Sequence, residues 1–296
     1  MNHREFAASL PRDELARLNE TNDAAGLRHL AGHAGIIIVS GLWIGMGLPL
    51  WQIMLVPHGV FICFLFTLEH EATHKTPFAS AWINEWAGRM CGFAIFLPFE
   101  WFRYFHLAHH RWTNIPGRDP ELADGSRPET VAAYILYVSG LPYWLGMAKR
   151  TFFNAIGRDP GEFVPNRARR RVVIESRIML TCYVLAGISL LATDLLFWIW
   201  ILPCLLGQPL LRLYLLAEHG HCALVANMLE NTRTTYTNGI IRRLAWNMPY
   251  HVEHHTLPQV PFHKLPELNF HMTGWHRVTS DGYVNATREY ARKLDL

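Results

Sequence analysis

The residues of this sequence best suited to chemistry are its histidines. There are 17 of them, and eight fall in three segments of five residues each. The first segment, residues 70–74, reads HEATH, the second, 106–110, reads HLAHH, and the third, 251–255, reads HVEHH. On a helix, residues three and four apart lie on one face. We therefore expect each of these histidine segments to present its imidazoles together.

Side-chain packing does not explain three such segments, because clustered imidazoles repel each other when protonated and need partners when buried. A metal ion supplies that partner. Eight nitrogen ligands exceed what one four-coordinate zinc can use, so the sequence predicts two ions, and imidazole suits iron, copper and zinc alike. This favours redox chemistry over Lewis acidity alone. The predicted ligands are His70, His74, His106, His109, His110, His251, His254 and His255.

The first histidine segment permits a rival interpretation as a membrane zinc metalloprotease. It contains the H-E-x-x-H pattern, in which His70 and His74 would hold zinc and Glu71 would be the general base. Two observations count against it. The residue three positions after His74 is not the glycine of the extended zinc motif, and a peptidase would leave the other two histidine segments unexplained.

The hydropathy pattern predicts an all-α integral membrane protein. Half of the 296 residues are hydrophobic, and several charge-poor windows reach the roughly 20 residues that a helix needs to cross a bilayer. Short turns join these windows in pairs, which predicts four spanning helices in two hairpins. The four windows are residues 30–50, 51–68, 178–192 and 195–216.

The turns and the weaker apolar stretches complete this prediction. Pro49 and Pro57 mark the turn of the first hairpin, and Thr193 with Asp194 marks that of the second. The shorter stretches, residues 86–99 and 131–147, are broken by proline and glycine, so we expect interfacial or re-entrant helices there. Residues 1–29 lack a secretory signal and predict an amphipathic surface segment. Residues 1–296 are expected to form a single domain.

Basic residues crowd the loop between the two hairpins, and the positive-inside rule places such a loop in the cytoplasm. Both termini and the histidine segments then face the cytoplasm, where the histidines form a cap on the membrane helices. The net charge of +3 does not indicate nucleic acid binding, because the same arginines serve orientation and contact with anionic lipids. These basic residues are Lys149, Arg150, Arg158, Arg167, Arg169, Arg170, Arg171 and Arg177.

The three histidine segments, placed between two apolar hairpins, resemble the histidine boxes of the membrane fatty acid desaturase family, which also contains hydroxylases and carotenoid ketolases. The resemblance covers roughly residues 68–266, a predicted histidine-box core. It includes FRYFHLAHHRWTNIPGRDPEL, AEHGHCALVANMLENTRTTYTN and WNMPYHVEHHTLPQVPFHKLP, which are similar to bacterial members. The H-P-G-G motif of a fused haem domain, which some members carry, is absent.

The resemblance implies a ninth ligand and a set of cofactors. His219, in the AEHGHC segment, is at the place of the family's ninth histidine, and His221 is the second choice. Where acyl-coenzyme A desaturases carry an asparagine four residues earlier, this sequence has Leu215. The implied cofactors are two iron ions, with dioxygen as co-substrate. A separate ferredoxin, b-type cytochrome or reductase would supply electrons, and the implied location is the bacterial inner membrane.

Three glutamates next to predicted ligands are candidates for orienting them. Glu71, Glu218 and Glu253 could each accept the free ring N–H of a histidine, as carboxylates around metal sites commonly do. The alternative is that these glutamates are simply solvated at helix ends.

Polar residues between the histidine segments have two interpretations each. Asn231, Arg233 and Thr234 either join the fourth spanning helix to the third histidine segment or only cap a loop. Arg111 and Asp119 either pair with each other to hold the loop after the second segment, or Arg111 meets an anionic head group.

The predicted function is that of a dioxygen-dependent di-iron oxidoreductase which desaturates the acyl chain of a lipid or an acyl thioester. The alternative is a hydroxylase or ketolase of an acyl, carotenoid or polar-lipid substrate. Loss of a second hydrogen gives an alkene and addition of oxygen gives an alcohol, so small changes in substrate position separate the two outcomes. A lipid-binding protein without catalysis is a third possibility, against which the complete histidine segments count.

Overall fold

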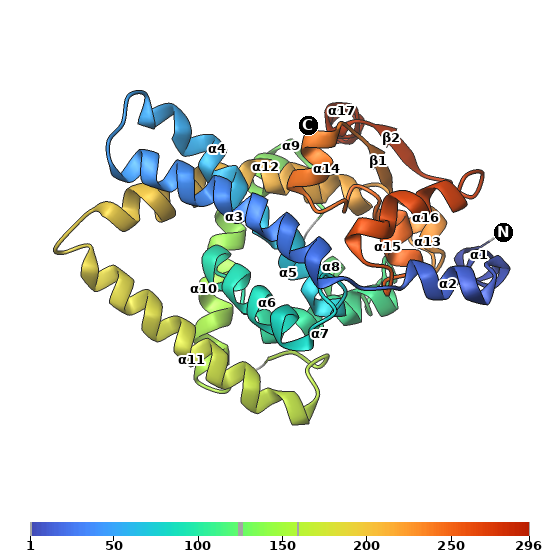
Figure 1. The fold of residues 1–296 in the computed structure, drawn as a ribbon, viewed down its shortest axis with the longest axis horizontal. Coiled ribbons are helices and arrows are strands. Elements are labelled where there is room, and N and C mark those ends of the chain that lie inside the picture. Colours follow the sequence, from blue (N-terminus) through green and yellow to red (C-terminus); the bar gives the residue numbers. More distant parts are fainter. Residues whose placement is uncertain (1, 124–126, 159, 296) are drawn as a thin grey trace.

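The computed structural model describes residues 2–123, 127–158 and 160–295. These residues are mostly helical (Figure 1), which confirms the predicted all-α class. Within them one small sheet forms, in which β1 (Thr234–Tyr236) pairs in parallel with β2 (Thr279–Asp281).

Among the described residues, four helical segments are long and apolar enough to cross a membrane. They form the two predicted hairpins, whose tips project to the left in Figure 1. The first hairpin consists of α3 (Asp23–Gly45) followed by α4 (Trp51–Cys63) and α5 (Leu65–His74). The second consists of α11 (Asn166–Ser189) followed by the π-helical η1 (Phe197–Ile201) and α12 (Leu202–His219).

The structure corrects three boundaries in the first hairpin. Pro57 lies inside α4 and not in the turn, as membrane helices tolerate. The turn is at residues 46–50, where Gly47 and Leu50 both have a φ of 61°. The second span continues to His74, so the first histidine segment belongs to a spanning helix. The surface segment predicted for residues 1–29 is shorter, because α3 already begins at Asp23.

Two short helices, α1 (His3–Ser9) and α2 (Arg12–Leu18), precede α3.

In the second hairpin, α11 begins twelve residues before the predicted window, at Asn166. Arg167, Arg171 and Arg177 are therefore helical and not part of a loop. The physical reason is that a helix can extend beyond the hydrocarbon layer, where polar residues no longer oppose it.

Small residues allow α4 and α12 to pack closely. A Cβ atom built on Gly59 would lie 1.8 Å from the carbonyl oxygen of Pro203, and one on Gly207 would lie 2.2 Å from the carbonyl carbon of Gly59. Close backbone approach through small residues is how membrane helices gain van der Waals contact. This contact fixes α12, and with it His219, relative to the first hairpin.

The two weaker apolar stretches form helices that differ from the four spans. α6 (Ala81–Ile95) exposes Trp82, Trp86 and Met90 on one face, as an interfacial helix would. α9 (Val131–Val138) and α10 (Leu141–Ala155) are bent by 60° at a short break. This shape agrees with the predicted re-entrant segment, although the pair would make a fifth span if it crossed the membrane as one unit.

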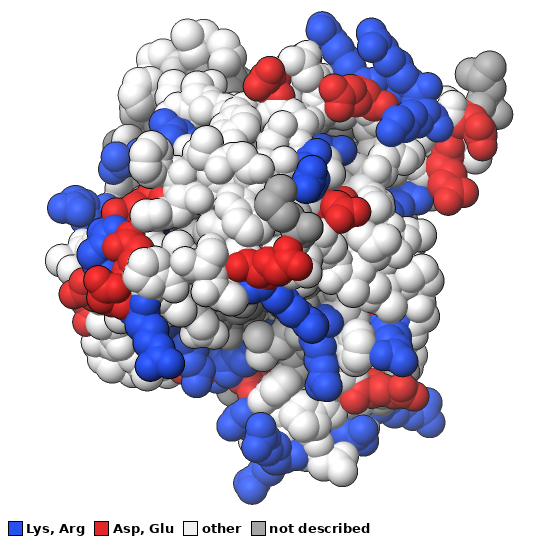
Figure 2. Space-filling view, turned by 90° about the vertical axis from the view of Figure 1, so that its right-hand side faces the viewer, with Lys and Arg blue, Asp and Glu red and all other residues white. Residues whose placement is uncertain are grey.

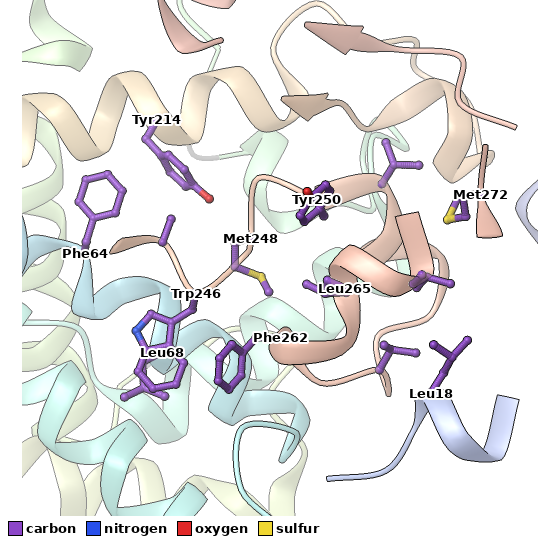
Figure 3. Close-up of a cluster of buried hydrophobic side chains, with 14 of the residues drawn as sticks. Leu18, Phe64, Leu68, Tyr214, Trp246, Met248, Tyr250, Phe262, Leu265 and Met272 are labelled. Atoms are coloured by element: carbon purple, nitrogen blue, oxygen red, sulfur yellow. The ribbon is translucent and has the colours of Figure 1, made fainter. Parts of the chain in front are cut away.

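A cap covers the ends of the spanning helices opposite to the hairpin tips. A buried apolar cluster joins the two parts, with Phe64, Leu68 and Tyr214 from the spans packed near Trp246 and Phe262 from the cap (Figure 3). Basic and acidic side chains both lie on the outer face of this end (Figure 2), as expected where protein meets water. The cap contains α7 (Phe99–Trp112), α8 (Pro120–Ala123), α13 (Met228–Asn231), α14 (Gly239–Leu244), α15 (His251–Thr256), η2 (Phe262–Lys264), α16 (Leu265–His271) and α17 (Tyr283–Ala291).

Candidate di-metal centre

Four helices bring the nine predicted ligands together where the spans meet the cap. The end of α5 carries the first histidine segment, α7 carries the second, and α15 carries the third. His219 is the last residue of α12, which ends where Gly220 follows. Eight of these nine side chains are buried, and His110 is partly buried.

One group of imidazoles gathers around the end of α5. Ligand atoms of His70, His106, His110 and His254 all lie within 4.8 Å of one another. His74 belongs with them, because its Nε2 atom is 2.8 Å from Nε2 of His106. We call these five residues the first histidine group.

A second group lies around the end of α12. Ligand atoms of His109, His219 and His255 lie within 4.8 Å of one another, and Nε2 of His251 is 3.1 Å from Nε2 of His219. We call these four residues the second histidine group. The two groups adjoin, since the rings of His110 and His255 stack with centroids 4.0 Å apart.

The donors fit two metal ions. Within the described residues, Nε2 of His110, His254 and His255 is buried without a hydrogen-bond partner, which is costly unless something else satisfies it. Burial lowers the pKa of His254 to about 3, aided by nearby His109, and neutral imidazole is the form that binds metals. Burial likewise lowers the pKa well below its usual value for His106, His110, His251 and His255.

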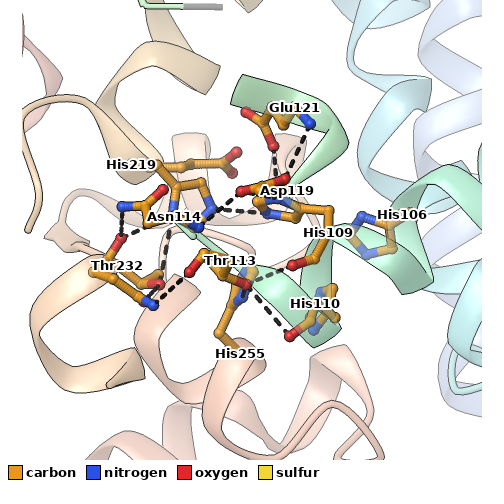
Figure 4. A network of polar contacts seen from close by, with 12 residues as sticks. His106, His109, His110, Thr113, Asn114, Asp119, Glu121, His219, Thr232 and His255 are labelled. Carbon is orange, nitrogen blue, oxygen red and sulfur yellow. Dashed lines mark hydrogen bonds and ion pairs between the residues drawn. The ribbon is translucent and has the colours of Figure 1, made fainter. Parts of the chain in front are cut away.

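Asp119 orients His109, a role that the sequence did not reveal. Nδ1 of His109 lies 3.0 Å from Oδ1 of Asp119 and 3.1 Å from Oε2 of Glu121 (Figure 4). Burial by itself lowers the pKa of His109, but Glu121 and Asp119 outweigh it and the net shift is upward. With its Nδ1–H donated to a carboxylate, His109 presents Nε2 toward the second histidine group. Arg111 does not pair with Asp119; it lies over the ring of Trp112.

Neutral oxygens hold two more histidines of the second group. Nδ1 of His255 lies 3.2 Å from Oγ1 of Thr113, and Nδ1 of His219 lies 3.1 Å from the backbone oxygen of Asn231. The side chain of Asn231 donates to the backbone oxygen of Thr113. Asn231 thus contacts the site through its main chain, and its amide holds the loop that carries Thr113.

The three predicted glutamates differ in position. Oε1 of Glu71 lies 3.3 Å from Nδ1 of His254, and Oε1 of Glu218 lies 3.4 Å from Nδ1 of His251. The structure does not bring Glu253 to a ligand histidine: it accepts hydrogen bonds from Thr234 and His276. The reason is helical geometry, because position 253 lies on a different face of α15 from positions 251, 254 and 255.

Arg233 and His221 also lie outside both histidine groups. Arg233 donates to the backbone oxygens of Ala217 and Gly220, which caps the end of α12 and supports the capping interpretation. His221 is exposed, has a φ of 55°, and places its ring 4.2 Å from that of Tyr290. Because α12 has ended, the chain turns His221 away from the second histidine group.

A cavity of about 1040 Å³ reaches both histidine groups. His70 and His106 of the first group line it, as do three members of the second. Much of the remaining wall is apolar and aromatic, as binding sites for organic molecules usually are. These wall residues include Phe66, Trp101, Phe102, Phe105, Leu136, Met147, Phe153 and Leu215.

Comparison with known proteins decides the family. The fatty acid desaturase family model matches residues 43–274, which include all three histidine segments and His219. This chain belongs to the fatty acid desaturase family. The predicted resemblance to this family is thereby confirmed, and membership supports an oxidoreductase of the desaturase type.

Three relatives illustrate the range of similar enzymes. A sphingolipid delta(4)-desaturase/C4-monooxygenase of Mus musculus is 26% identical over 247 residues, covering 79% of this chain and 70% of the relative. An sn-1 oleoyl-lipid 12-desaturase of Arthrospira platensis is 28% identical over 82 residues, covering 26% and 23% of the two chains. A fatty acid conjugase of Calendula officinalis is 22% identical over 251 residues, covering 73% and 66%.

Proposed function

We propose that this desaturase-family protein is a dioxygen-dependent di-iron enzyme that introduces a double bond into the acyl chain of a lipid or an acyl thioester. The observation that carries the proposal is the pair of buried histidine groups at the wall of a largely apolar cavity. The first group would hold one iron and the second group the other.

The protein residues have definable tasks in such a site. Asp119 and Glu121 hold Nδ1 of His109, and the main chain of Asn231 holds Nδ1 of His219. Each contact directs the opposite ring nitrogen toward the shared centre and fixes the tautomer. Bound iron, with dioxygen, supplies the redox chemistry that an unactivated C–H bond requires, which acid and base side chains do not provide.

The cavity wall positions the substrate. Aromatic side chains such as Trp101, Phe102 and Phe105 exclude water and restrict the path of an acyl chain past His106 and His109. Which C–H bond reaches the metal pair depends on that path, and small displacements change the reaction outcome. The wall therefore sets both the position of oxidation and the balance between alkene and alcohol.

Hydroxylation of an acyl or polar-lipid substrate is the second candidate. The relative from Mus musculus carries both a desaturase and a monooxygenase activity in its name. The metalloprotease alternative has less support, because Glu71 is fully buried and its carboxylate faces His254 and the backbone N–H of Phe262. A general base for peptide hydrolysis would need contact with a water molecule.

We further propose a location and partners. The protein would lie in the bacterial inner membrane with both termini and the cap in the cytoplasm, since basic residues concentrate near the cap ends of α10 and α11. A separate ferredoxin, b-type cytochrome or reductase would deliver electrons. Nucleic acid has no part in this proposal.

Lipid analysis tests the reaction. Total lipids from cells with and without the protein are compared by mass spectrometry, together with a metal count on the purified enzyme. A product lacking two hydrogens, with about two irons per chain, supports the desaturase. A product with one added oxygen makes the protein a hydroxylase, whereas zinc without any lipid change supports the metalloprotease.

A further inference from the structure

Arg212 is a charged residue inside a spanning helix. It lies in α12, seven residues before His219, which places the two about 10 Å apart along the helix axis. Ionisable side chains in membrane segments are costly and face the protein interior or a cavity, where they commonly mark a functional site. Arg212 lines the same cavity that reaches both histidine groups.

Two tyrosines and a glutamine surround the guanidinium of Arg212 and hold it in place. Its Cζ atom lies 4.7 Å from the ring centroid of Tyr143 and 5.8 Å from that of Tyr137. When the amide of Gln208 presents its oxygen, Nε and Nη2 donate to it at 3.0 and 3.2 Å. Among the described residues, no carboxylate oxygen lies within ion-pair distance of the guanidinium. Glu218, which lines the same cavity, interacts with Arg212 at longer range.

The cavity as a whole also carries more positive than negative side chains among the described residues. An ordinary hydrocarbon tunnel would have neither. The basic residues that line it are Arg127, Lys149, Arg150, Arg158 and Arg212, and the acidic ones are Glu121, Glu129 and Glu218.

We propose that Arg212, flanked by Tyr137 and Tyr143 and held by Gln208, binds an oxyanion of the substrate, either a carboxylate or a phosphate. The planar guanidinium matches such groups better than an ammonium does, and a charged hydrogen bond is strongest away from water. The proposal rests on the proposed function for the fate of the acyl chain. It specifies an anionic amphiphile whose reacting carbon lies near its polar group, because Arg212 and His219 are close along α12.

A purely structural role for Arg212 is the competing explanation. Its contacts with Tyr137 of α9 and Tyr143 of α10 could simply fasten the bent helix pair to α12. The two explanations differ in what they predict for ligands of equal length and different charge. A fastening role requires no preference for anions.

Binding to the full-length protein, purified in detergent, tests the proposal. The four probes are oleate, oleyl alcohol, dioleoyl phosphatidate and dioleoylglycerol, each measured by tryptophan fluorescence titration. The proteins are wild type, Arg212→Gln, Arg212→Lys and Arg170→Gln, the last being an exposed arginine outside this cavity. Thermal unfolding of each variant reports on structure separately.

We expect wild type and Arg170→Gln to bind at least one anionic probe about tenfold more tightly than its neutral partner. Arg212→Gln should remove that preference without weakening the neutral probe, and Arg212→Lys should retain part of it. A preference for oleate identifies the carboxylate, and one for phosphatidate identifies the phosphate.

Equal binding of charged and neutral probes by wild type would overturn the proposal, even if every Arg212 variant failed to fold. An anion preference that survives in Arg212→Gln would overturn it as well. These measurements need neither iron nor turnover. A protein that prefers anions through Arg212 but oxidises no lipid would contradict the proposed function. That result would still support the anion-binding site at Arg212.

Discussion

Among single residues, the histidines divide into those proposed to bind metal and those with structural partners. The sequence contains 17 histidines, and the structure gathers nine of them into two groups while giving others local partners. His33 bonds to the backbone oxygen of Phe61, and His58 bonds to Ser40 and to the backbone oxygen of Ile199. Ligand and structural histidines should therefore respond differently to substitution.

Replacing one ligand in each group tests the assignment. His109→Ala and His254→Ala should each lose iron and abolish dioxygen-dependent turnover, because each removes one nitrogen from a group that we propose surrounds an ion. His221→Ala is the matched control and should keep its iron, since its ring lies against Tyr290. Metal analysis and turnover of membrane-inserted protein are the measurements. Full activity in His109→Ala or His254→Ala would show that the assignment is wrong.

Asp119 allows a subtler test, because it acts through His109. Asp119→Asn removes the charge that holds Nδ1 of His109, and substitutions of this kind typically weaken metal binding about 10- to 100-fold. We expect iron to be lost at lower chelator concentration, with Asp119→Glu recovering part of the affinity. Asp13→Asn, at an exposed site on α2, should match wild type. Unchanged chelator resistance in Asp119→Asn would show that Asp119 does not support metal binding through His109.

The spacing of histidines is visible in sequence, but their division between two ions is not. Periodicity places His106, His109 and His110 on one side of a helix, yet the structure assigns His109 to a different group from its neighbours. That division depends on how α5, α7, α12 and α15 meet. The role of Asp119 was hidden for a similar reason, since a loop ten residues after His109 folds back by contacts that follow no periodic pattern.

At the scale of elements, the hairpins follow from hydropathy while their exact ends do not. Apolar windows detect the portion of a helix within lipid, but α11 extends outward from its window and α5 continues through the first histidine segment. Polar residues at those ends are stabilised by protein contacts, which hydropathy does not measure. The bent pair α9 and α10 was recognisable because proline and glycine interrupt its apolar stretch.

The contact between α4 and α12 gives a prediction at this scale. Gly207→Leu would force a side chain into the backbone of Gly59, and overpacking of this kind typically costs about 1–3 kcal/mol. We expect a lower unfolding temperature and reduced iron content, because α12 carries His219. Gly187→Leu on α11 has open space around it and serves as control. Equal stability of the two variants would contradict the close packing of α4 against α12.

In the molecule as a whole, the cap buries many neutral imidazoles. Their burial predicts how the stability of the metal-free protein changes with pH. Burial lowers the pKa of five of the proposed ligand histidines, all outside the spans, including His254 and His255. Below their usual pKa of about 6.5, the unfolded chain binds protons that the folded chain does not, so stability is lost as pH falls. His109 opposes this trend, because its pKa is raised.

Chelator-treated protein should thus unfold at a lower temperature at roughly pH 5 than at roughly pH 7.5. The iron-loaded protein should change less over this range, since protons must then compete with the metal. The unfolding temperatures of the metal-free and the iron-loaded protein are measured in detergent, with circular dichroism as the signal. A metal-free protein that becomes more stable on acidification would contradict the buried, neutral histidine groups.

If the two histidine groups hold two iron ions, elemental analysis of the anaerobically purified protein will detect both. We predict about two irons per chain, falling well below this value in both His109→Ala and His254→Ala. Zinc as the bound metal, or a single ion per chain that persists in both variants, would contradict a di-iron centre at these histidines.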